Sequence, residues 1–432
     1  MPTKRRNHSG IEHAYRQRTP KSAEMMQRAA KAMPGGNTRT TTFHAPYPVV
    51  FERGTGAWLT DLDGHRYVDV FNNGLSLIHG HAYDPVREMA AQVMPHGTAW
   101  AGASRYQVEF AELLQARIPG GGLVRFTNDG SEAGMLAAQI ARRATGRPLL
   151  LKFKWAYHGS FPDLEAGLYG QGEIAGRTVL AEFNDLASCE RAMQQHGDQI
   201  AAVFYEPVMY TGRVVPAAKG FLNALEKLAR KRGILTIMDD CLMFRLAVGG
   251  SSERYDLKPD LVALGKFIGG GTPVGAVVGR KELLALLDPR EPGCMFHGGS
   301  FNGNVLGCAL GLVAMQGLTA AAIDRMGDQT RRITESWRNK ASSLGIDVTI
   351  TSEGSVAGLA FAADPARHED DPAGLGIAKL FHLACLNEGI AMGPVGLLAL
   401  STAIDEPAMA HLIRGWDKAF DAITEVIDSR RT

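Results

Sequence analysis

The stretch "GFLNALEKLARKRGILTIMDDC" (residues 220–241) joins a helix pattern to a strand pattern and decides the class of fold. Its apolar residues at 221, 222, 225, 228 and 229 share one face of a helix. Gly233 stands where that helix should end, because glycine readily adopts the left-handed conformation of a helix C-cap. The mainly apolar run 234–238 then indicates a strand that is buried on both faces. A helix that leads directly into a buried strand is typical of an α/β fold.

Further apolar runs of strand length lie on both sides of this stretch, and helical patterns such as 131–146 separate several of them. The alternation predicts a mostly parallel, seven-stranded sheet with helices on both faces. In such sheets the functional side chains lie at the carboxyl ends of the strands. The other six predicted strands are 123–128, 148–153, 177–183, 201–207, 260–266 and 274–279.

The two ends of the chain have a different pattern. We expect a helix at 22–33, a strand pair within 49–64, a long helix at 312–345 and a final helix at 406–428. Both ends are expected to share one smaller α+β domain beside the sheet. The predicted division is an N-terminal segment 1–60, a large domain 61–311 and a C-terminal small domain 312–432.

Composition narrows the class of protein. Hydrophobic residues make up 45% and charged residues 21%, the balance of a globular protein with a large core. A formal charge of +1 argues against nucleic acid or an anionic membrane as the main partner. No apolar run reaches the roughly 18 residues of a membrane span, and no signal-peptide pattern is seen. The five cysteines show no metal-ligand spacing, so we expect reduced thiols, no metal and a cytoplasmic location.

Lys266, in "ALGKFIGGGTPVGAV" (263–277), ends an apolar strand and precedes three glycines. A lysine in an apolar context is costly unless its amine is used or its charge is matched. The glycines would let a ligand approach the backbone closely. A desolvated lysine is also what Schiff-base chemistry with a carbonyl needs. The alternative is a lysine that is simply ion-paired or extends to the solvent.

Other strand ends carry chemical groups of their own. Gly130 and Ser131 follow one strand and open a helix, which indicates either a phosphate site or an ordinary serine N-cap. Tyr157 and His158 follow another strand, and an aromatic ring there either stacks on a ligand or belongs to the core. Asp239 ends the strand of the opening stretch, and a buried carboxylate needs a partner.

No one of these signals is specific alone, but together they supply an amine, a carboxylate, a stacking ring and a phosphate site at one sheet edge. Pyridoxal 5'-phosphate requires this combination. Its aldehyde would be held by Lys266, its ring nitrogen would be kept protonated by Asp239, and its phosphate would lie at the helix start.

Stretches spread from about residue 30 to 310 carry a resemblance to a known family. They include "MPGGNTR", "RFTNDGSEA", "YHG", "YEPV", "DDCLMFRLAVGG", "PDLVALGKFIGGGTPVGAVVGR" and "HGGSFNGNVL". The sequence resembles the class III aminotransferases of fold type I, and within them the glutamate-1-semialdehyde 2,1-aminomutase-like branch. The segment "MPGGNTRTTTFHAPYP" (33–48) is similar to that of β-amino acid aminotransferases, such as those acting on β-phenylalanine.

The resemblance implies roles for individual residues. Lys266 would form the internal aldimine and shuttle a proton, and Asp239 would pair with the pyridinium nitrogen. Gly130 and Ser131 would bind the phosphate, and Tyr157 would stack on the ring. His158 and Glu206 are expected beside the cofactor. Ser300 and Phe301 would reach the phosphate of the neighbouring subunit, so a homodimer with shared sites is expected.

Three positions depart from the pattern of the family. Asp240 replaces the usual glutamate, and Cys241 replaces an apolar residue expected against the ring face opposite Tyr157. We interpret Cys241 as a small packing residue rather than a reactive thiol. Asp129 replaces a serine or threonine and would bring a carboxylate near the phosphate unless its side chain turns away.

Arg39 matches the arginine that binds the substrate carboxylate in β-amino acid aminotransferases, so the resemblance implies a substrate contact here; the alternative is a structural or exposed arginine.

The leading hypothesis is a pyridoxal-phosphate-dependent aminotransferase that moves an amino group between an amino acid, possibly a β-amino acid with one carboxylate, and a keto acid. The alternatives are an intramolecular aminomutase and another reaction of the same cofactor, such as epimerisation. Two further alternatives come from other classes of protein. One is a hydrolase with a metal site at Asp239, Asp240 and His158, and the other is a catalytically inactive binding protein.

Overall fold

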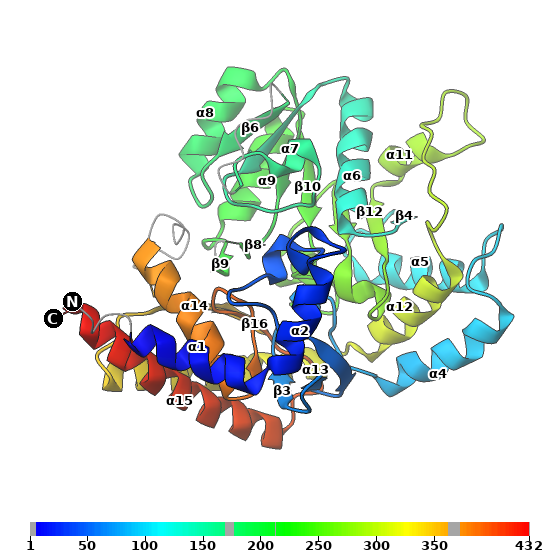
Figure 1. The fold of residues 1–432 in the computed structure, drawn as a ribbon. Coiled ribbons are helices and arrows are strands. Elements are labelled where there is room, and N and C mark those ends of the chain that lie inside the picture. Colours follow the sequence, from blue (N-terminus) through cyan, green and yellow to red (C-terminus); the bar gives the residue numbers. More distant parts are fainter. Residues whose placement is uncertain (1–5, 169–176, 212, 362–371, 432) are drawn as a thin grey trace. The chain divides into compact units, whose positions relative to one another are not determined.

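The computed structural model describes residues 6–168, 177–211, 213–361 and 372–431 (Figure 1). The chain divides into two units. Unit 1 comprises Met1–Gly74, His79–Tyr83 and Asp324–Thr432, and unit 2 comprises Leu75–Ile78 and Asp84–Ile323. Both ends of the chain therefore belong to unit 1. The predicted domain boundaries after residues 60 and 311 stay predictions, because this division reflects only how the backbone is packed.

Unit 2 is built on a seven-stranded sheet whose members are the seven predicted strands (Figure 1). Only β12 runs antiparallel to its neighbours, and the remaining neighbours pair in parallel. The predicted α/β fold with a mostly parallel sheet is thus confirmed. In spatial order the strands are β4 (Leu123–Thr127), β12 (Gly275–Gly279), β11 (Leu261–Leu264), β10 (Leu235–Asp239), β7 (Ile200–Tyr205), β5 (Leu149–Phe153) and β6 (Thr178–Ala181).

Helices cover both faces of this sheet. Phe204 of β7 shares a core cluster with the buried face of α6 (Gly130–Thr145). The next residue, Tyr205, donates a 2.7 Å hydrogen bond to Glu226 of α9 (Phe221–Lys231). Because successive strand residues point to opposite faces, α6 and α9 lie on opposite sides of the sheet.

The turn between α9 and β10 forms as its sequence predicts. Gly233 has a φ of 61°, in the left-handed region. Its N–H donates to the carbonyl of Arg230 (3.2 Å), and the N–H of Ile234 donates to the carbonyl of Ala229 (3.0 Å). This pair of bonds is the Schellman motif, which satisfies carbonyls that the end of a helix leaves free. The chain thereby enters β10 and delivers Asp239 to the sheet edge.

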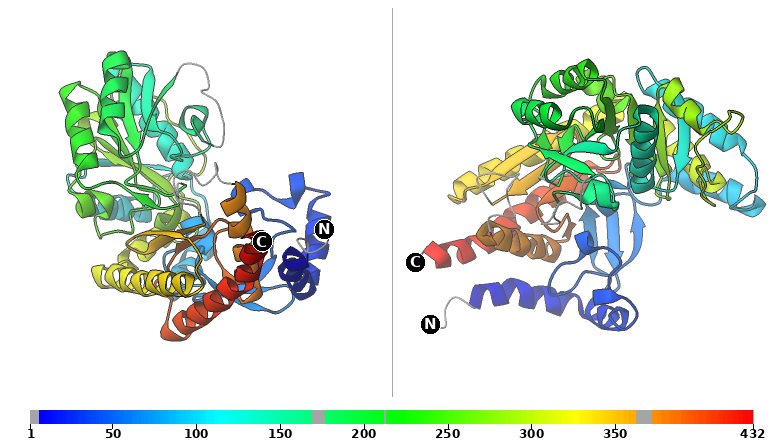
Figure 2. Two further views of the ribbon diagram at one scale, coloured as in Figure 1. Left: turned by 90° about the vertical axis from the view of Figure 1, so that its left-hand side faces the viewer. Right: turned by 90° about the horizontal axis from the view of Figure 1, so that it is seen from above.

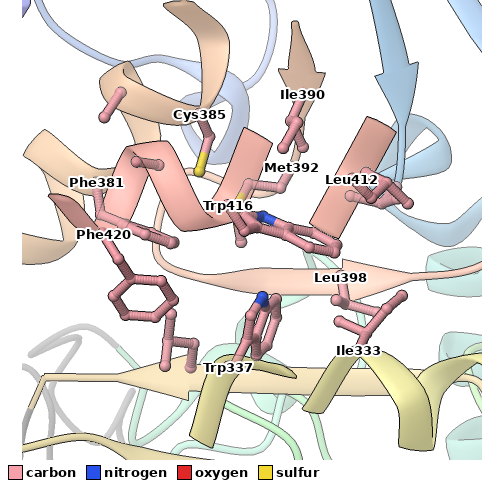
Figure 3. Close-up of a cluster of buried hydrophobic side chains, with 14 of the residues drawn as sticks. Ile333, Trp337, Phe381, Cys385, Ile390, Met392, Leu398, Leu412, Trp416 and Phe420 are labelled. Carbon is pink, nitrogen blue, oxygen red and sulfur yellow. The ribbon is translucent and has the colours of Figure 1, made fainter. Parts of the chain in front are cut away.

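Unit 1 contains a four-stranded and a three-stranded sheet with helices from both chain ends. The helix α1 (Arg6–Arg18) packs on α14 (Pro372–Asn387) and on α15 (Glu406–Arg431), as Figure 2 shows. The core of this unit centres on Trp337 and Trp416, whose rings meet edge to face at 5.0 Å (Figure 3). The strands are β1 (Phe51–Thr55), β2 (Trp58–Asp61), β3 (Arg66–Asp69), β15 (Ile390–Ala391), β13 (Thr349–Glu353), β14 (Val356–Ala360) and β16 (Leu397–Ala399).

Two helix predictions need correction. The single helix expected at 312–345 is wrong, because the chain forms α12 (Val305–Gly317) and then α13 (Ala320–Ser343). The hydroxyl of Thr319 accepts a hydrogen bond from the N–H of Ala322 (3.3 Å), so Thr319 starts the second helix as a cap. The helix expected at 22–33 lies earlier, as α2 (Pro20–Ala29), and α1 before it was not predicted.

Among the described residues, no single helix combines the length and apolar character needed to cross a membrane. The bent pair formed by α12 and α13 passes that test by length and composition alone. The predicted cytoplasmic location stays a prediction.

Candidate active site

The parallel pairing of β10 and β11 brings two of the predicted catalytic residues to one sheet edge. Asp239, the last residue of β10, stands opposite Ala263 of β11, and Lys266 follows two residues after β11 ends. Lys266 has a φ of 57°, a left-handed conformation that is uncommon for a residue with a side chain. Such backbone strain is often found at functional positions.

Asp239 is held by two hydrogen-bond donors. Nδ1 of His158 lies 3.0 Å from Oδ2, and the N–H of Cys241 lies 3.0 Å from Oδ1. Burial raises the pKa of Asp239, but the His158 hydrogen bond and the Lys266 charge outweigh it, so its pKa lies below the usual value. Burial lowers the pKa of His158 in turn. A neutral imidazole therefore donates from Nδ1 to an ionised carboxylate, since that carboxylate can only accept.

Asp240 points away from this pair. Its Oδ1 accepts from the Ser251 hydroxyl (2.6 Å) and its Oδ2 from the Ser251 N–H (2.9 Å). Burial raises the pKa of Asp240 to about 7. The alternative metal site needed Asp239, Asp240 and His158 around one ion, and the structure does not bring these three together. In the described part of the chain, no group of three or more His, Cys, Asp or Glu side chains could hold a metal ion.

Cys241 fills the space where three site segments meet. A Cβ atom added to Gly130 would lie 2.8 Å from its Sγ, and one added to Gly265 would lie 2.9 Å from the backbone of Gly130. Burial raises the pKa of the thiol well above its usual value, so the sulfur stays protonated. These observations support a packing role for Cys241, because burial outweighs the opposing charge of Lys266 and keeps the sulfur in its less reactive thiol form.

The start of α6 is capped by Asp129 rather than by Ser131. Oδ1 of Asp129 accepts the N–H of Glu132 (2.8 Å), so its side chain turns back onto the helix. The Ser131 hydroxyl is left to accept the N–H of Ser160 (3.3 Å). A Cβ on Gly159 would lie 2.6 Å from Cα of Ser131, so the 157–160 segment packs directly on this helix start.

The surroundings of His158, Tyr157 and Glu206 differ. The ring of His158 packs on Phe204 at 4.6 Å, and the Tyr157 hydroxyl lies 3.3 Å from that of Ser160. Glu206 is buried, and burial together with the charge of Asp239 raises its pKa well above the usual value. Its Oε1 has no hydrogen-bond partner among the described groups, although Oε2 accepts the N–H of Tyr210 (3.5 Å).

Three further predicted site residues, Ser300, Phe301 and Arg39, are exposed. Ser300 and Phe301 lie on the surface of unit 2, and Phe301 is 59% exposed. Arg39 belongs to unit 1, where its Nη2 donates to Oδ1 of Asn73 (2.7 Å). The hydrogen bond between His158 and Asp239 and the buried Lys152 were not predicted from the sequence. The sequence does contain a sign of the buried Lys152, because this lysine lies inside the apolar run 148–153.

Comparison with known proteins gives consistent matches over most of the chain. Residues 40–164 and 173–405 match the family Aminotransferase class-III. A glutamate-1-semialdehyde 2,1-aminomutase of Myxococcus xanthus is 34% identical over 427 residues, which is 93% of this chain and 98% of that protein. A beta-phenylalanine transaminase of Variovorax paradoxus is 31% identical over 405 residues, 91% of this chain and 92% of that protein.

Solved structures of similar proteins share the fold. An omega-transaminase from Sphaerobacter thermophilus has a TM-score of 0.88 at 33% identity and covers 93% of this chain and 97% of its own. A transaminase with PLP bound has a TM-score of 0.89 at 31% identity, covering 96% of this chain and 99% of its own.

Proposed function

The chain belongs to the class III aminotransferases, which use pyridoxal 5'-phosphate, and on that premise we propose that it moves an amino group between an amino acid and a keto acid. The observation that carries the proposal is the ionised, mostly buried Asp239, which His158 holds and which the charge of Lys266 stabilises. We further propose a donor with one carboxylate, of the β-amino acid class. The resemblance of the segment around Arg39 and the similarity to a beta-phenylalanine transaminase support this choice of donor.

The described residues fit the cofactor. The side chain of Asp239 is 12% exposed, so one edge of an otherwise buried anion is open to a cationic ring nitrogen. Oε1 of Glu206 is a buried oxygen without a partner in the described structure, and such an atom is expected beside a ligand. The start of α6 at Gly130 and Ser131 is a helix N-terminus, whose backbone N–H groups suit a phosphate, although the N–H of Glu132 already donates to Asp129.

Each proposed contact uses one part of the cofactor. Lys266 would bind its aldehyde, Asp239 its ring nitrogen, and Tyr157 the face of its ring. Gly130 and Ser131 would bind its phosphate. When bound, the cofactor supplies an electron sink for the negative charge that develops at the substrate carbon bearing the amine.

The protein side chains then have definite proton states. His158 keeps its proton on Nδ1 and donates it to Asp239, which stays ionised and so favours a protonated ring nitrogen. Nζ of Lys266 would take the proton from the substrate carbon and return it. Cys241 packs closely on Gly130, which keeps the segments that carry these groups in contact.

An intramolecular aminomutase is the second candidate, and the 34% identity to a protein named glutamate-1-semialdehyde 2,1-aminomutase supports it. Such an enzyme would use the same cofactor residues but keep the amine on its substrate. A transaminase releases keto product only while an added keto acid accepts the amine, whereas a mutase rearranges its substrate without one.

The first test is the visible absorbance of purified protein before and after borohydride. Wild type should lose its absorbance band on reduction, and Lys266→Ala should neither show that band nor transfer an amine. Amine transfer that survives in Lys266→Ala would overturn the proposal. Assays of candidate donors with and without keto acid then separate transaminase from mutase.

We also propose that two copies share their sites through Ser300 and Phe301, whose exposure leaves them available to a second chain. The test mixes two inactive variants, Lys266→Ala and Ser300→Trp, after separate purification. In mixed dimers one site would combine an intact Lys266 with the partner's intact Ser300, so activity should reappear. If each variant is inactive alone and their mixture stays inactive after subunit exchange, the shared site is wrong.

A further inference from the structure

Lys152 is a fully buried lysine that none of the proposed catalytic steps uses. It lies within β5 and is 0% exposed. Its Nζ donates to three backbone carbonyls, those of Ala156 (2.8 Å), Leu164 (2.7 Å) and Ala166 (2.7 Å). An ammonium group has three N–H donors, so every one of them is used. The three carbonyl oxygens replace the water that the charge gives up on burial.

The positions of these carbonyls along the chain are informative. Ala156 immediately precedes Tyr157 and His158, whereas Leu164 and Ala166 follow them. A single ammonium therefore joins the two ends of the segment 156–166. A neutral amide or apolar side chain could not donate to all three carbonyls, because an amide has only two donors and an apolar side chain has none.

This segment reaches two of the strand ends that make the site. His158 donates to Asp239 at the end of β10, and its ring packs on Phe204 of β7. Ser160 donates to the Ser131 hydroxyl at the start of α6, on which Gly159 also packs. The position of His158 beside Asp239 and the contact of Ser160 with Ser131 thus both depend on the segment 156–166.

We propose that Lys152 is a positioning residue whose buried ammonium fixes the 156–166 segment and thereby holds Tyr157 and His158 in the site. The inference rests on the proposed function for the roles of those two residues, but the tether itself is a property of the protein without cofactor. Burial, partly offset by Glu206 and Glu165, lowers the pKa of Lys152 to about 8. The charged form therefore persists at neutral pH, with all three donors available.

The test compares Lys152→Met, Lys152→Gln and the control Lys154→Met. Methionine matches the length of the lysine stem but has no donor, and glutamine keeps two donors without the charge. Lys154 lies two residues further along and is exposed, where it pairs with Glu182. Hydrogen exchange of the cofactor-free proteins is measured for peptides covering 155–166, α6 and β10. Circular dichroism of the bound cofactor and its dissociation rate are measured in the loaded proteins.

In Lys152→Met, exchange should quicken in 155–166 while α6 and β10 keep wild-type rates. The cofactor should dissociate about tenfold faster, because the loss corresponds to roughly one hydrogen bond to a charged group. The circular dichroism of the bound cofactor should also change. Lys152→Gln should be intermediate and Lys154→Met unchanged. The positioning role would be overturned by an equal increase of exchange in all three peptides or by unchanged exchange in 155–166. Failure of both Lys152 variants to fold would also overturn it. A wild type that binds no cofactor would refute the proposed function, while the exchange comparison would still test the tether.

Discussion

Nδ1 of His158 lies 3.0 Å from Oδ2 of Asp239, although the two residues are far apart in sequence. The imidazole is 2% exposed and packs on Phe204, so it cannot easily turn away. Asp239 thus receives one donor from the segment after β5 and a second from the N–H of Cys241 in its own turn. These donors and the charge of Lys266 explain why a buried carboxylate stays ionised here.

Replacing His158 by phenylalanine should weaken binding of pyridoxal 5'-phosphate without unfolding the protein. Phenylalanine fills the same space on Phe204 but donates nothing to Asp239. A hydrogen bond to a charged group is worth about 1.5–3 kcal/mol, so the dissociation constant should rise about 10- to 100-fold. Equilibrium titration of the cofactor-free protein measures it, with Tyr157→Phe as a control that keeps a stacking ring. An unchanged affinity in His158→Phe would mean that the hydrogen bond does not control the charge of Asp239.

The stability of the cofactor-free protein should depend on pH through Asp240. Burial raises its pKa from the usual 3.8 to about 7 in the folded chain. The folded state therefore holds a proton that the unfolded state has lost, so this contribution to stability is complete below about pH 4. It declines as the pH rises and is lost as the pH passes 7.

Asp240→Asn should remove that dependence, because an amide does not titrate. Its carbonyl can still accept the Ser251 N–H, and the Ser251 hydroxyl can turn toward the Met243 carbonyl, 3.3 Å away. Urea unfolding at several pH values between 4.5 and 8 gives the free energy of unfolding of both proteins. As the pH rises across that range, the free energy of unfolding of wild type should fall by a few kcal/mol relative to that of the variant. Parallel pH curves would contradict the raised pKa.

The sequence was sufficient to predict the strands and the edge at which chemistry occurs. Buried parallel strands read as apolar runs whatever their neighbours are, and their carboxyl ends meet at one edge by geometry. Asp239 and Lys266 could therefore be assigned to that edge before the structure was known. Their cofactor roles come from the family resemblance and remain proposals at the level of single residues.

The hydrogen-bond partners of single side chains could not be predicted from the sequence, because they depend on the direction in which each side chain points. Asp239 and Asp240 are identical neighbours, yet one faces His158 and the other Ser251. The chain also uses Asp129 instead of Ser131 as a cap, so the helix begins at Gly130, two residues before a Ser131 cap would start it. Lys152 was missed because a lysine in an apolar run can equally extend to solvent. Only the carbonyls gathered around its amine distinguish the two cases.

The packing of Cys241 against Gly130 should appear as energetic coupling. Gly130→Ala places a Cβ 2.8 Å from Sγ, which is too close, so the single variant should lose about 1–3 kcal/mol of stability. Cys241→Ala removes the sulfur and opens that space. In the double variant the loss should be smaller than the sum of the two single losses. Urea unfolding of the four cofactor-free proteins measures the coupling, and strict additivity would show that these residues do not pack together.

The last prediction concerns Arg39, whose role as the carboxylate contact is a proposal. Arg39→Ala should lower kcat/KM for a donor with a carboxylate about 10- to 100-fold, the worth of a hydrogen bond to a charged group, and leave a simple amine almost unaffected. Equal losses for both donors would remove the role.

Within unit 1, Arg39 is held by Asn73, and the backbone around that residue is unusual. Asn72, Asn73 and Gly74 have consecutive φ values of 49°, 54° and 68°, a left-handed run that is costly for residues with side chains. Asn73→Gly should relieve that cost and leave the melting temperature equal or higher, yet free the Arg39 side chain. Because the freed arginine must be ordered again by the substrate, KM for the carboxylated donor should rise while kcat changes little. An unchanged KM in Asn73→Gly, with Arg39→Ala still impaired, would show that Arg39 acts without help from Asn73.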